Sequence, residues 1–211
     1  PLSFCMTTAP TCTGGIGSVE EYVYELLVYL SPANDWTFHW SECCLNNSGN
    51  LANASMYASC TINNLNGTLN NSPYFTDPDY YITALGIQND LPLNALEADG
   101  DSLVNTFEVP DAYFVCPGQL TQATYLSPYT LAVPFSSSVP IIFDPLTCVL
   151  HFVPSMQQFV IVAIRTDEYR NGVLIGSVKR ELQLEFFPFF NPISPAFDDQ
   201  MLKANNGFIA A

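Results

Sequence analysis

Two long apolar and alternating stretches in the last third of the chain predict its main structural element. Residues 159–164 are apolar at every position, which is typical of a strand buried on both faces. Residues 178–186 alternate, with Arg180 and apolar side chains on one side and Lys179 and other polar side chains on the other. Asn171-Gly172 lies between them and suits a tight two-residue turn with positive φ angles. We therefore expect a long β-hairpin over residues 159–186, as the spine of a β-sandwich domain.

Shorter patterns predict further strands along the chain. Trp36, Phe38 and Trp40 alternate with polar residues, which predicts a strand whose aromatic face we expect in the core. Residues 20–30 contain three Tyr and two Val, which favours strand over helix. Further strands are expected at residues 82–85, 103–109, 113–116, 123–126, 131–135, 141–143 and 149–153. Residues 1–18 and the Asn-rich residues 46–71 are expected to be irregular.

Composition favours an all-β fold. Aromatic and β-branched residues are plentiful, helix formers are scarce, and 16 Pro and 11 Gly supply turns. The Pro- and Asp-rich residues 72–80 separate two apolar patterns, so we place a domain boundary near residue 76. The expected architecture is two tandem β-sandwich modules. A small disulfide-held module occupies residues 1–76, a second sandwich residues 77–187, and a linker or the start of a next module residues 188–211.

The net charge of −15 is unevenly distributed. No Lys or Arg precedes Arg165, whereas the same stretch holds 14 Asp and Glu. Such a surface repels nucleic acid phosphates and anionic membranes, so we expect no nucleic-acid partner and no direct membrane insertion. It favours divalent cations, high salt or a basic partner.

The cysteines indicate an exported protein with disulfides. There are seven, at Cys5, Cys12, Cys43, Cys44, Cys60, Cys116 and Cys148. None forms a Cys-x-x-Cys pair and only two His are present, which argues against a structural zinc site. Adjacent cysteines in a strand point to opposite faces, so we expect Cys43 or Cys44 to pair with Cys60 and the other with Cys5 or Cys12. The odd count leaves one thiol free or paired outside the chain, and the start at Pro1 indicates a processed product or a piece of a longer protein.

The acidic turn after the expected domain boundary is the first candidate site. Glu97, Asp99 and Asp101 lie at i, i+2 and i+4 around a Gly, and three such carboxylates can converge on a hard cation. Asp77 and Asp79 add ligands if the loops meet. Ca²⁺ is the candidate ion for this turn, and a solvated acidic turn before a strand is the simpler interpretation.

Other motifs suggest different chemistry. Residues 100–103 spell Gly-Asp-Ser-Leu, the tag of a hydrolase family whose Ser needs an activating Asp and His. His151 is the only downstream His, and no Asp-x-x-His precedes it, so we do not expect an enzyme. Trp36 and Trp40 can stack on sugar rings if they are exposed, while His39 is expected at the surface.

Four charged residues gather at the expected hairpin tip: Arg165, Asp167, Glu168 and Arg170. They can contact a neighbouring module, or they can pair across the strands of an exposed tip. Cross-strand pairing is the simpler interpretation, and each such pair contributes under about 1 kcal/mol.

Several short segments, in order over roughly residues 19–185, carry a resemblance to a known family. They are VEEYVY at 19–24, DWTFHW at 35–40, CCLNN at 43–47, SPYF at 72–75, DGDSL at 99–103 and EYRNGVLIG at 168–176. Together they resemble the extracellular modules of large Bacteroidota surface proteins, of the gliding-motility-associated adhesin type exported by type IX secretion. The resemblance implies tandem Ig-like or cadherin-like sandwiches in a long, non-catalytic protein. Cys148 stands where that family usually has Gly, which suggests a partner such as Cys116.

We therefore expect a secreted or cell-surface structural segment of an adhesin or filament. The expected partners are neighbouring modules of the same chain or other subunits. Surface polysaccharide is a further candidate partner. A carbohydrate-binding module using Trp36 and Trp40 is the first alternative. A secreted hydrolase with paired carboxylates such as Glu97 and Asp101 is the second.

Overall fold

The structure is a computed structural model that describes residues 2–5, 18–21, 25–42, 48–52, 56–65, 67, 69–115 and 119–188. The described residues form strands, turns and irregular segments and contain no helix, which confirms the all-β class. The strands are β1 (Leu2–Cys5), β2 (Ser18–Glu21), β3 (Trp36–Glu42), β4 (Leu51–Ala52), β5 (Met56–Ile62), β6 (Tyr80–Ala84), β7 (Asn89–Pro92), β8 (Ser102–Glu108), β9 (Asp111–Val115), β10 (Gln119–Gln122), β11 (Thr124–Tyr125), β12 (Ile142–Asp144), β13 (Val149–Phe152), β14 (Gln158–Arg170) and β15 (Val173–Phe187).

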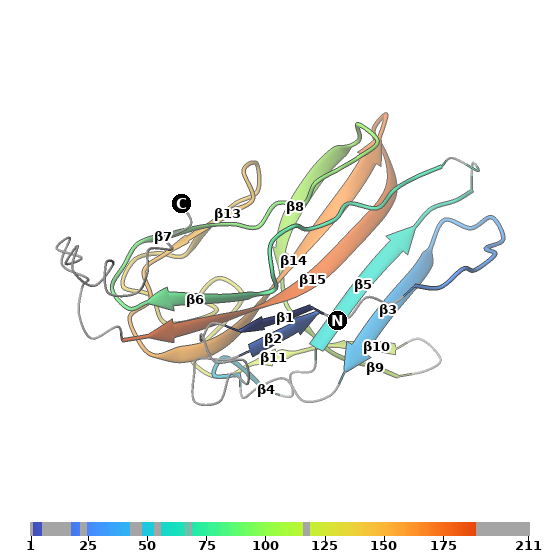
Figure 1. The fold of residues 1–211 in the computed structure, drawn as a ribbon. Coiled ribbons are helices and arrows are strands. Elements are labelled where there is room, and N and C mark those ends of the chain that lie inside the picture. The colour runs from blue at the N-terminus through green and yellow to red at the C-terminus, as the bar shows by residue number, and fades with distance from the viewer. Residues whose placement is uncertain are drawn as a thin grey trace, which may run out of the picture.

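The predicted hairpin is confirmed as the central element. β14 pairs with β15 from Gln158↔Phe186 to Arg170↔Val173, so the pairing runs the whole length of β14. Asn171 and Gly172 have φ angles of 52° and 78°, which is the all-positive geometry expected for an Asn-Gly turn. The pair of strands runs through the molecule with β5 and β3 beside β15 and with β8 beside β14 (Figure 1).

The outer edges of both hairpin strands are also hydrogen-bonded. β8 pairs along residues 163–169 of β14. β15 shares its outer edge between two strands: antiparallel β5 at residues 176–179 and parallel β6 at residues 183–187. β3 then pairs with β5, which completes a sheet of order β3-β5-β15-β14-β8 with β6 attached to β15. Every other strand of this sheet therefore pairs with the hairpin directly or, in the case of β3, through β5.

The main core lies between one end of the hairpin and a second sheet. This sheet has the order β12-β13-β7. Side chains of β13 pack against those of β14 and β15 in a buried cluster: Leu93, Phe135, Cys148, Leu150, Phe152, Val160, Val162, Ile164, Leu182, Leu184 and Phe186. The rings of Phe135, Phe152 and Phe186 lie 5.0 to 5.7 Å apart between centroids. Two facing sheets around this core give a β-sandwich-like architecture.

The opposite face of β14 is covered as well. Ile161 is 2% exposed and packs with Leu51, Ala112 and Ala123 in a second buried cluster. The first arm of the hairpin is thus apolar because both of its faces are buried, as the sequence predicts.

The strand pairing does not follow the expected domain boundary at residue 76. β5 and β3 precede this boundary, yet β5 pairs with β15, which lies in the expected second module. Strands from both sides of residue 76 therefore form one sheet, whereas β1 and β2 pair with each other in a two-stranded sheet within residues 1–76. Residues 189–211, expected as a linker or a next module, lie outside the described residues.

Several local predictions are wrong. β5 lies in the Asn-rich stretch and β1 near the N-terminus, both of which were expected to be irregular. Residues 25–30 and 131–135 were expected to be strands and are irregular. Leu26 and Tyr29 are 85% and 97% exposed, so the burial that favours a strand of this composition is missing.

The aromatic row of β3 is not core. Phe38 and Trp40 are each 37% exposed, and neither belongs to a buried cluster. The row is more exposed than expected because β3 is the terminal strand of the sheet as far as the structure describes it. The indole Nε1 of Trp36 donates a hydrogen bond to the Ser31 carbonyl oxygen at 2.8 Å.

Cys60 and Cys148 are free thiols, so the disulfides expected for them are absent. The Cys60 sulfur lies 3.4 Å from the Ser72 hydroxyl, and Cys148 is fully buried within the main core. Burial raises the pKa of the Cys148 thiol to about 11. The Cys5 side chain and residues Cys12, Cys43, Cys44 and Cys116 lie outside what the structure describes.

Substitution of Gly172 tests the hairpin turn. Gly172→Ala is expected to lower the free energy of unfolding by about 1–2 kcal/mol, because a Cβ at positive φ is strained. Gly172→Asn is the matched control, and it should retain most of the stability because Asn tolerates this conformation. Urea unfolding measures both variants. Equal stability of Gly172→Ala and the unsubstituted protein would contradict the turn geometry.

Candidate cation site

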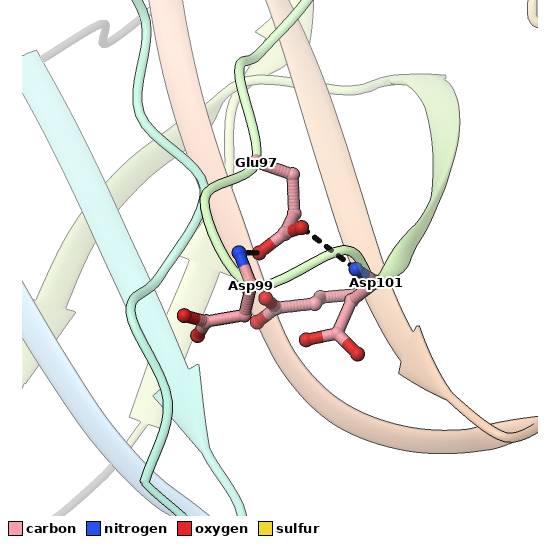
Figure 2. A group of neighbouring side chains, drawn as sticks. Glu97, Asp99 and Asp101 are labelled. Carbon is pink, nitrogen blue, oxygen red and sulfur yellow. Dashed lines mark hydrogen bonds between the residues drawn. The ribbon is translucent and has the colours of Figure 1, made fainter.

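The acidic turn is organised by one of its own carboxylates. Glu97 accepts backbone hydrogen bonds from Asp99 at 2.6 Å, from Gly100 at 2.5 Å and from Asp101 at 2.7 Å. Figure 2 shows two of these bonds, from the backbone of Asp99 and from that of Asp101 to the Glu97 carboxylate. Gly100 has a φ of 86°, a conformation that suits Gly and turns the chain back toward Glu97. The spacing in the sequence thus corresponds to a tight loop whose carboxylates lie close together.

A neighbouring segment fixes this loop from the side. Tyr74 and Leu96 exchange backbone hydrogen bonds of 3.0 and 2.8 Å. Asp99 then accepts two hydrogen bonds from Asn71, one from the backbone at 2.6 Å and one from the side-chain amide at 2.8 Å. Residues 70–74 and 96–101 therefore form one surface layer.

The hairpin contributes a fourth carboxylate, from Glu168 on β14. Glu168 pairs in register with Gly176, and the register shifts immediately after it at a β-bulge. A Cβ at Gly176 would lie 3.0 Å from Glu168 Oε2, so the Gly leaves room for the carboxylate. Glu168 is fully buried. Its Oε2 accepts a hydrogen bond from the Asn70 amide at 2.7 Å, and its Oε1 has no hydrogen-bond partner among the described residues.

These residues form the acidic cluster, defined as Glu97, Asp99, Asp101 and Glu168. One carboxylate oxygen from each lies within 4.8 Å of the others. An all-oxygen set of this kind is suited to a hard cation, so the cluster can hold a metal ion. The structure brings together the three residues of the predicted turn. It does not bring Asp77 or Asp79 to them.

Arg170 is the counter-ion of the cluster. Its Nε lies 2.8 Å from Asp101 Oδ1 and its Nη2 lies 2.5 Å from Asp101 Oδ2, a two-pronged contact. The same guanidinium donates to the Leu69 carbonyl oxygen and to Asn70 Oδ1, each at 2.9 Å. One cation therefore faces four acidic side chains.

The electrostatics of the cluster differ from residue to residue. Hydrogen bonds from Asn71 lower the pKa of Asp99, and a hydrogen bond from Arg170 lowers that of Asp101. Burial acts to raise the pKa of Glu97, but three backbone N–H groups outweigh it and the pKa is lowered. Burial raises the pKa of Glu168, and the charges of Asp101 and Glu97 act in the same direction. The hydrogen bond from Asn70 and the charge of Arg170 only partly offset these effects, so Glu168 is the member whose charge is least compensated.

Asp79 has a different partner. Its Oδ1 accepts a hydrogen bond from Arg180 Nη1 at 3.0 Å. Arg180 is 4% exposed, stacks on the ring of Phe75 at 3.9 Å and also donates to the Leu93 carbonyl oxygen. The loop at residues 75–79 thus serves to neutralise a buried Arg, which is why it does not contribute to the acidic cluster.

The charges near the hairpin tip pair with strands, not with a neighbouring module in the described chain. Arg165 lies 2.7 Å from Glu108 of β8 and 3.0 Å from Asp167. Arg170 turns to the acidic cluster instead. The cross-strand interpretation describes Arg165, whereas Glu168 is a buried site residue that the sequence interpretation missed. The only feature that points to Glu168 as a site residue is that it lies opposite Gly176 on the neighbouring strand. This pairing cannot be recognised until the strand register is known.

The described contacts do not join Ser102 of the Gly-Asp-Ser-Leu motif and His151 in a catalytic triad. Ser102 is exposed at the start of β8 in the six-stranded sheet. His151 lies on β13 of the other sheet, where its Nδ1 is 2.7 Å from Asp90 Oδ1.

Comparison with protein-family models, with curated proteins and with solved structures gave no significant match. No described helix is long and apolar enough to cross a membrane. The resemblance to surface adhesin modules therefore stays a prediction.

A partly buried carboxyl on β15 of the hairpin provides a pH-dependent prediction. Glu181 accepts backbone hydrogen bonds from Asp111 at 2.7 Å and from Tyr57 at 3.2 Å. Burial raises the pKa of Glu181 from 4.5 to about 8, against the lowering effect of these bonds. The native state then holds a proton that the unfolded state has lost between these pH values. Its stabilising contribution is full below about pH 4.5 and is lost by about pH 8.

The free energy of unfolding is expected to fall as pH rises from 5 to 8, by at most about 1.4 kcal/mol per pH unit. Above pH 8 this fall should level off. Glu181→Gln removes the titrating group. The difference in the free energy of unfolding between the two proteins should therefore change with pH by this amount. Urea unfolding at successive pH values measures it. Parallel profiles of the variant and the unsubstituted protein would show that Glu181 does not titrate in this range.

Proposed function

We propose that the chain is a non-catalytic structural and adhesive segment of a secreted or cell-surface protein, stabilised by Ca²⁺. The observation that carries this proposal is the β14–β15 hairpin, whose strands of 13 and 15 residues continue from one end of the described sheet to the other. Because β8, β5 and β6 pair along its outer edges, separating the hairpin requires many backbone hydrogen bonds to break together. This arrangement suits a protein that transmits force between neighbouring modules or subunits.

The surface chemistry supports an extracellular setting. A net charge of −15 keeps the chain apart from anionic membranes and nucleic acid, and it favours surroundings rich in divalent cations. The resemblance to Bacteroidota adhesin modules of the type IX secretion and gliding-motility class agrees with this. The Ig-like or cadherin-like character of the module, and a place in a filament, belong to the same proposal.

Ca²⁺ is compatible with the acidic cluster. Ca–O distances of about 2.3–2.6 Å and an irregular all-oxygen coordination are typical of this ion. The four oxygens of the cluster lie within 4.8 Å of one another, so one ion can reach all of them. Glu168 Oε1 provides a second argument, since a fully buried carboxylate oxygen without a partner is costly unless a cation or a donor meets it.

A cation at this place would fasten three parts of the chain together. Glu97, Asp99 and Asp101 belong to the surface loop, Glu168 belongs to the hairpin, and the Asn70 amide links the preceding segment to Glu168. The loop and the hairpin would then separate only after the ion leaves. This is the role expected of Ca²⁺ in a structural module.

Single-molecule pulling on the chain ends tests the structural role. We expect one cooperative unfolding event, at a higher force in millimolar CaCl₂ than in EDTA, because the ion adds contacts that must break before the loop leaves the hairpin. Gradual extension at low force, without a distinct unfolding event in either buffer, would contradict a structural function.

Thermal unfolding of variants tests the cation site separately. A ligand that binds only the native state stabilises it by RT ln(1 + [L]/Kd), so CaCl₂ should raise the Tm of the unsubstituted protein by several degrees relative to EDTA. Asp99→Asn combined with Asp101→Asn should remove this rise, and so should Glu168→Gln.

Asp77→Asn is the matched control. Asp77 lies on the surface outside the cluster, so its loss should leave the rise in Tm unchanged. Identical melting curves in CaCl₂ and EDTA, or equal loss of the rise in Asp77→Asn, would contradict the assignment of the site.

A carbohydrate-binding module is the second candidate function. It is favoured by the exposure of Phe38 and Trp40 on β3, because exposed rings on one strand face can stack on sugars.

A further inference from the structure

A groove of about 850 Å³ lies on the face of the six-stranded sheet opposite to the aromatic row. Its floor consists of side chains from β3, β5, β15, β14 and β8, and Leu120 to Gln122 of β10 form part of its wall. Thr37 lines the groove, whereas Trp36 and Phe38 on either side of it point to the other face of β3. The volume is within the range of ordinary small-ligand sites.

Hydroxyl groups form a row across the floor. Thr37 is in register with Thr61, and Thr61 is in register with Ser177, so three adjacent strands present a hydroxyl at the same level. Ser59 adds another hydroxyl on the next level. Neighbouring strands lie about 4.8 Å apart, so the row has a regular spacing of donors that are also acceptors.

The charged side chains of the groove are balanced. Glu108, Asp111, Arg165 and Lys179 line it, two acidic and two basic, in a chain whose net charge is −15. Arg165 lies 2.7 Å from Glu108, and Lys179 lies 2.8 Å from Asp111. A charged ligand would have to compete with these pairs, whereas a neutral ligand would not.

The wall of the groove is tied to its floor. Lys179 donates to the Val109 carbonyl oxygen at 2.8 Å, and the Asp111 backbone donates to Glu181 at 2.7 Å. Lys179 and Asp111 are both nearly buried, with side-chain exposures of 9% and 1%. These contacts hold β9 against β15. Less conformational entropy of the groove wall is therefore lost when a ligand binds.

We propose that this groove binds a neutral polysaccharide chain. Hydroxyl rows and paired charges offer donors and acceptors in large number, which is what a neutral polyhydroxyl ligand needs. A peptide would need pockets for apolar anchors, and Leu120 is the only large aliphatic side chain lining the groove. The inference goes beyond the structural function, because it assigns a partner to a surface that takes no part in the cation site.

Affinity gel electrophoresis tests the proposal with defined probes. Dextran, mannan and soluble β-1,3-glucan represent neutral polysaccharides, and alginate and heparin represent anionic ones. All gels contain EDTA, so that the acidic cluster contributes nothing and the result does not depend on the proposed Ca²⁺ site. At least one neutral polysaccharide should retard the protein, and the anionic ones should not.

Paired variants locate the binding site. Thr37→Val combined with Thr61→Val removes two hydroxyls and keeps the shape, and it should weaken retardation about tenfold. Thr76→Val combined with Thr124→Val changes two exposed Thr outside the groove and should bind as the unsubstituted protein does. Trp40→Ala tests the aromatic row and should also leave binding unchanged. Circular dichroism checks that each variant is folded, and Ser177→Ala replaces the Thr pair if it is not.

Three results would overturn the proposal. The first is no retardation by any neutral polysaccharide, including the case in which only an anionic one binds. The second is equal binding by the groove variant and its control. The third is loss of binding in Trp40→Ala with the groove variant unaffected, which would assign the sugar to the aromatic row.

Discussion

The continuous hydrogen bonding between β14 and β15 is the constraint on which the rest of the structure depends. One end of this hairpin provides the apolar side chains that pack against β13, with Val162 and Leu184 fully buried. The other end receives β5 and β8 and carries Glu168 into the acidic cluster. A single element therefore links the core, the sheet and the candidate site.

The basic side chains of the hairpin explain how an acidic chain folds around it. Each contacts a different preceding segment: Arg165 contacts Glu108, Arg170 contacts Asp101, Lys179 contacts Asp111 and Arg180 contacts Asp79. The uneven charge along the sequence thus has a structural reason: the basic side chains of the β14–β15 hairpin neutralise acidic side chains of the segments that precede it. Three of these acids lie in loops or at strand starts that would otherwise repel one another.

The sequence predicts what is local and misses what is set by pairing across the chain. The hairpin follows from Asn171-Gly172 and from alternation, and the turn around Gly100 follows from spacing. Glu168 could not be assigned to the site, because its place depends on the register opposite Gly176 and on a bulge. β5 was missed because its Asn-rich flanks outweighed the strand-favouring Thr61 and Ile62. The pairing of β5 across residue 76 was missed for the same reason, since its partner β15 comes more than a hundred residues later.

Native-state hydrogen exchange tests most directly whether the hairpin unites the described chain. If the hairpin does so, the amides of Val162, in the core half, and of Val178, beside β5, exchange through openings of equal free energy, close to that of global unfolding. The free energies of these two openings should decrease in parallel as urea is added. Exchange of the β5 half through a separate opening of much lower free energy would contradict the account, because the two halves would then be independent modules joined only in sequence.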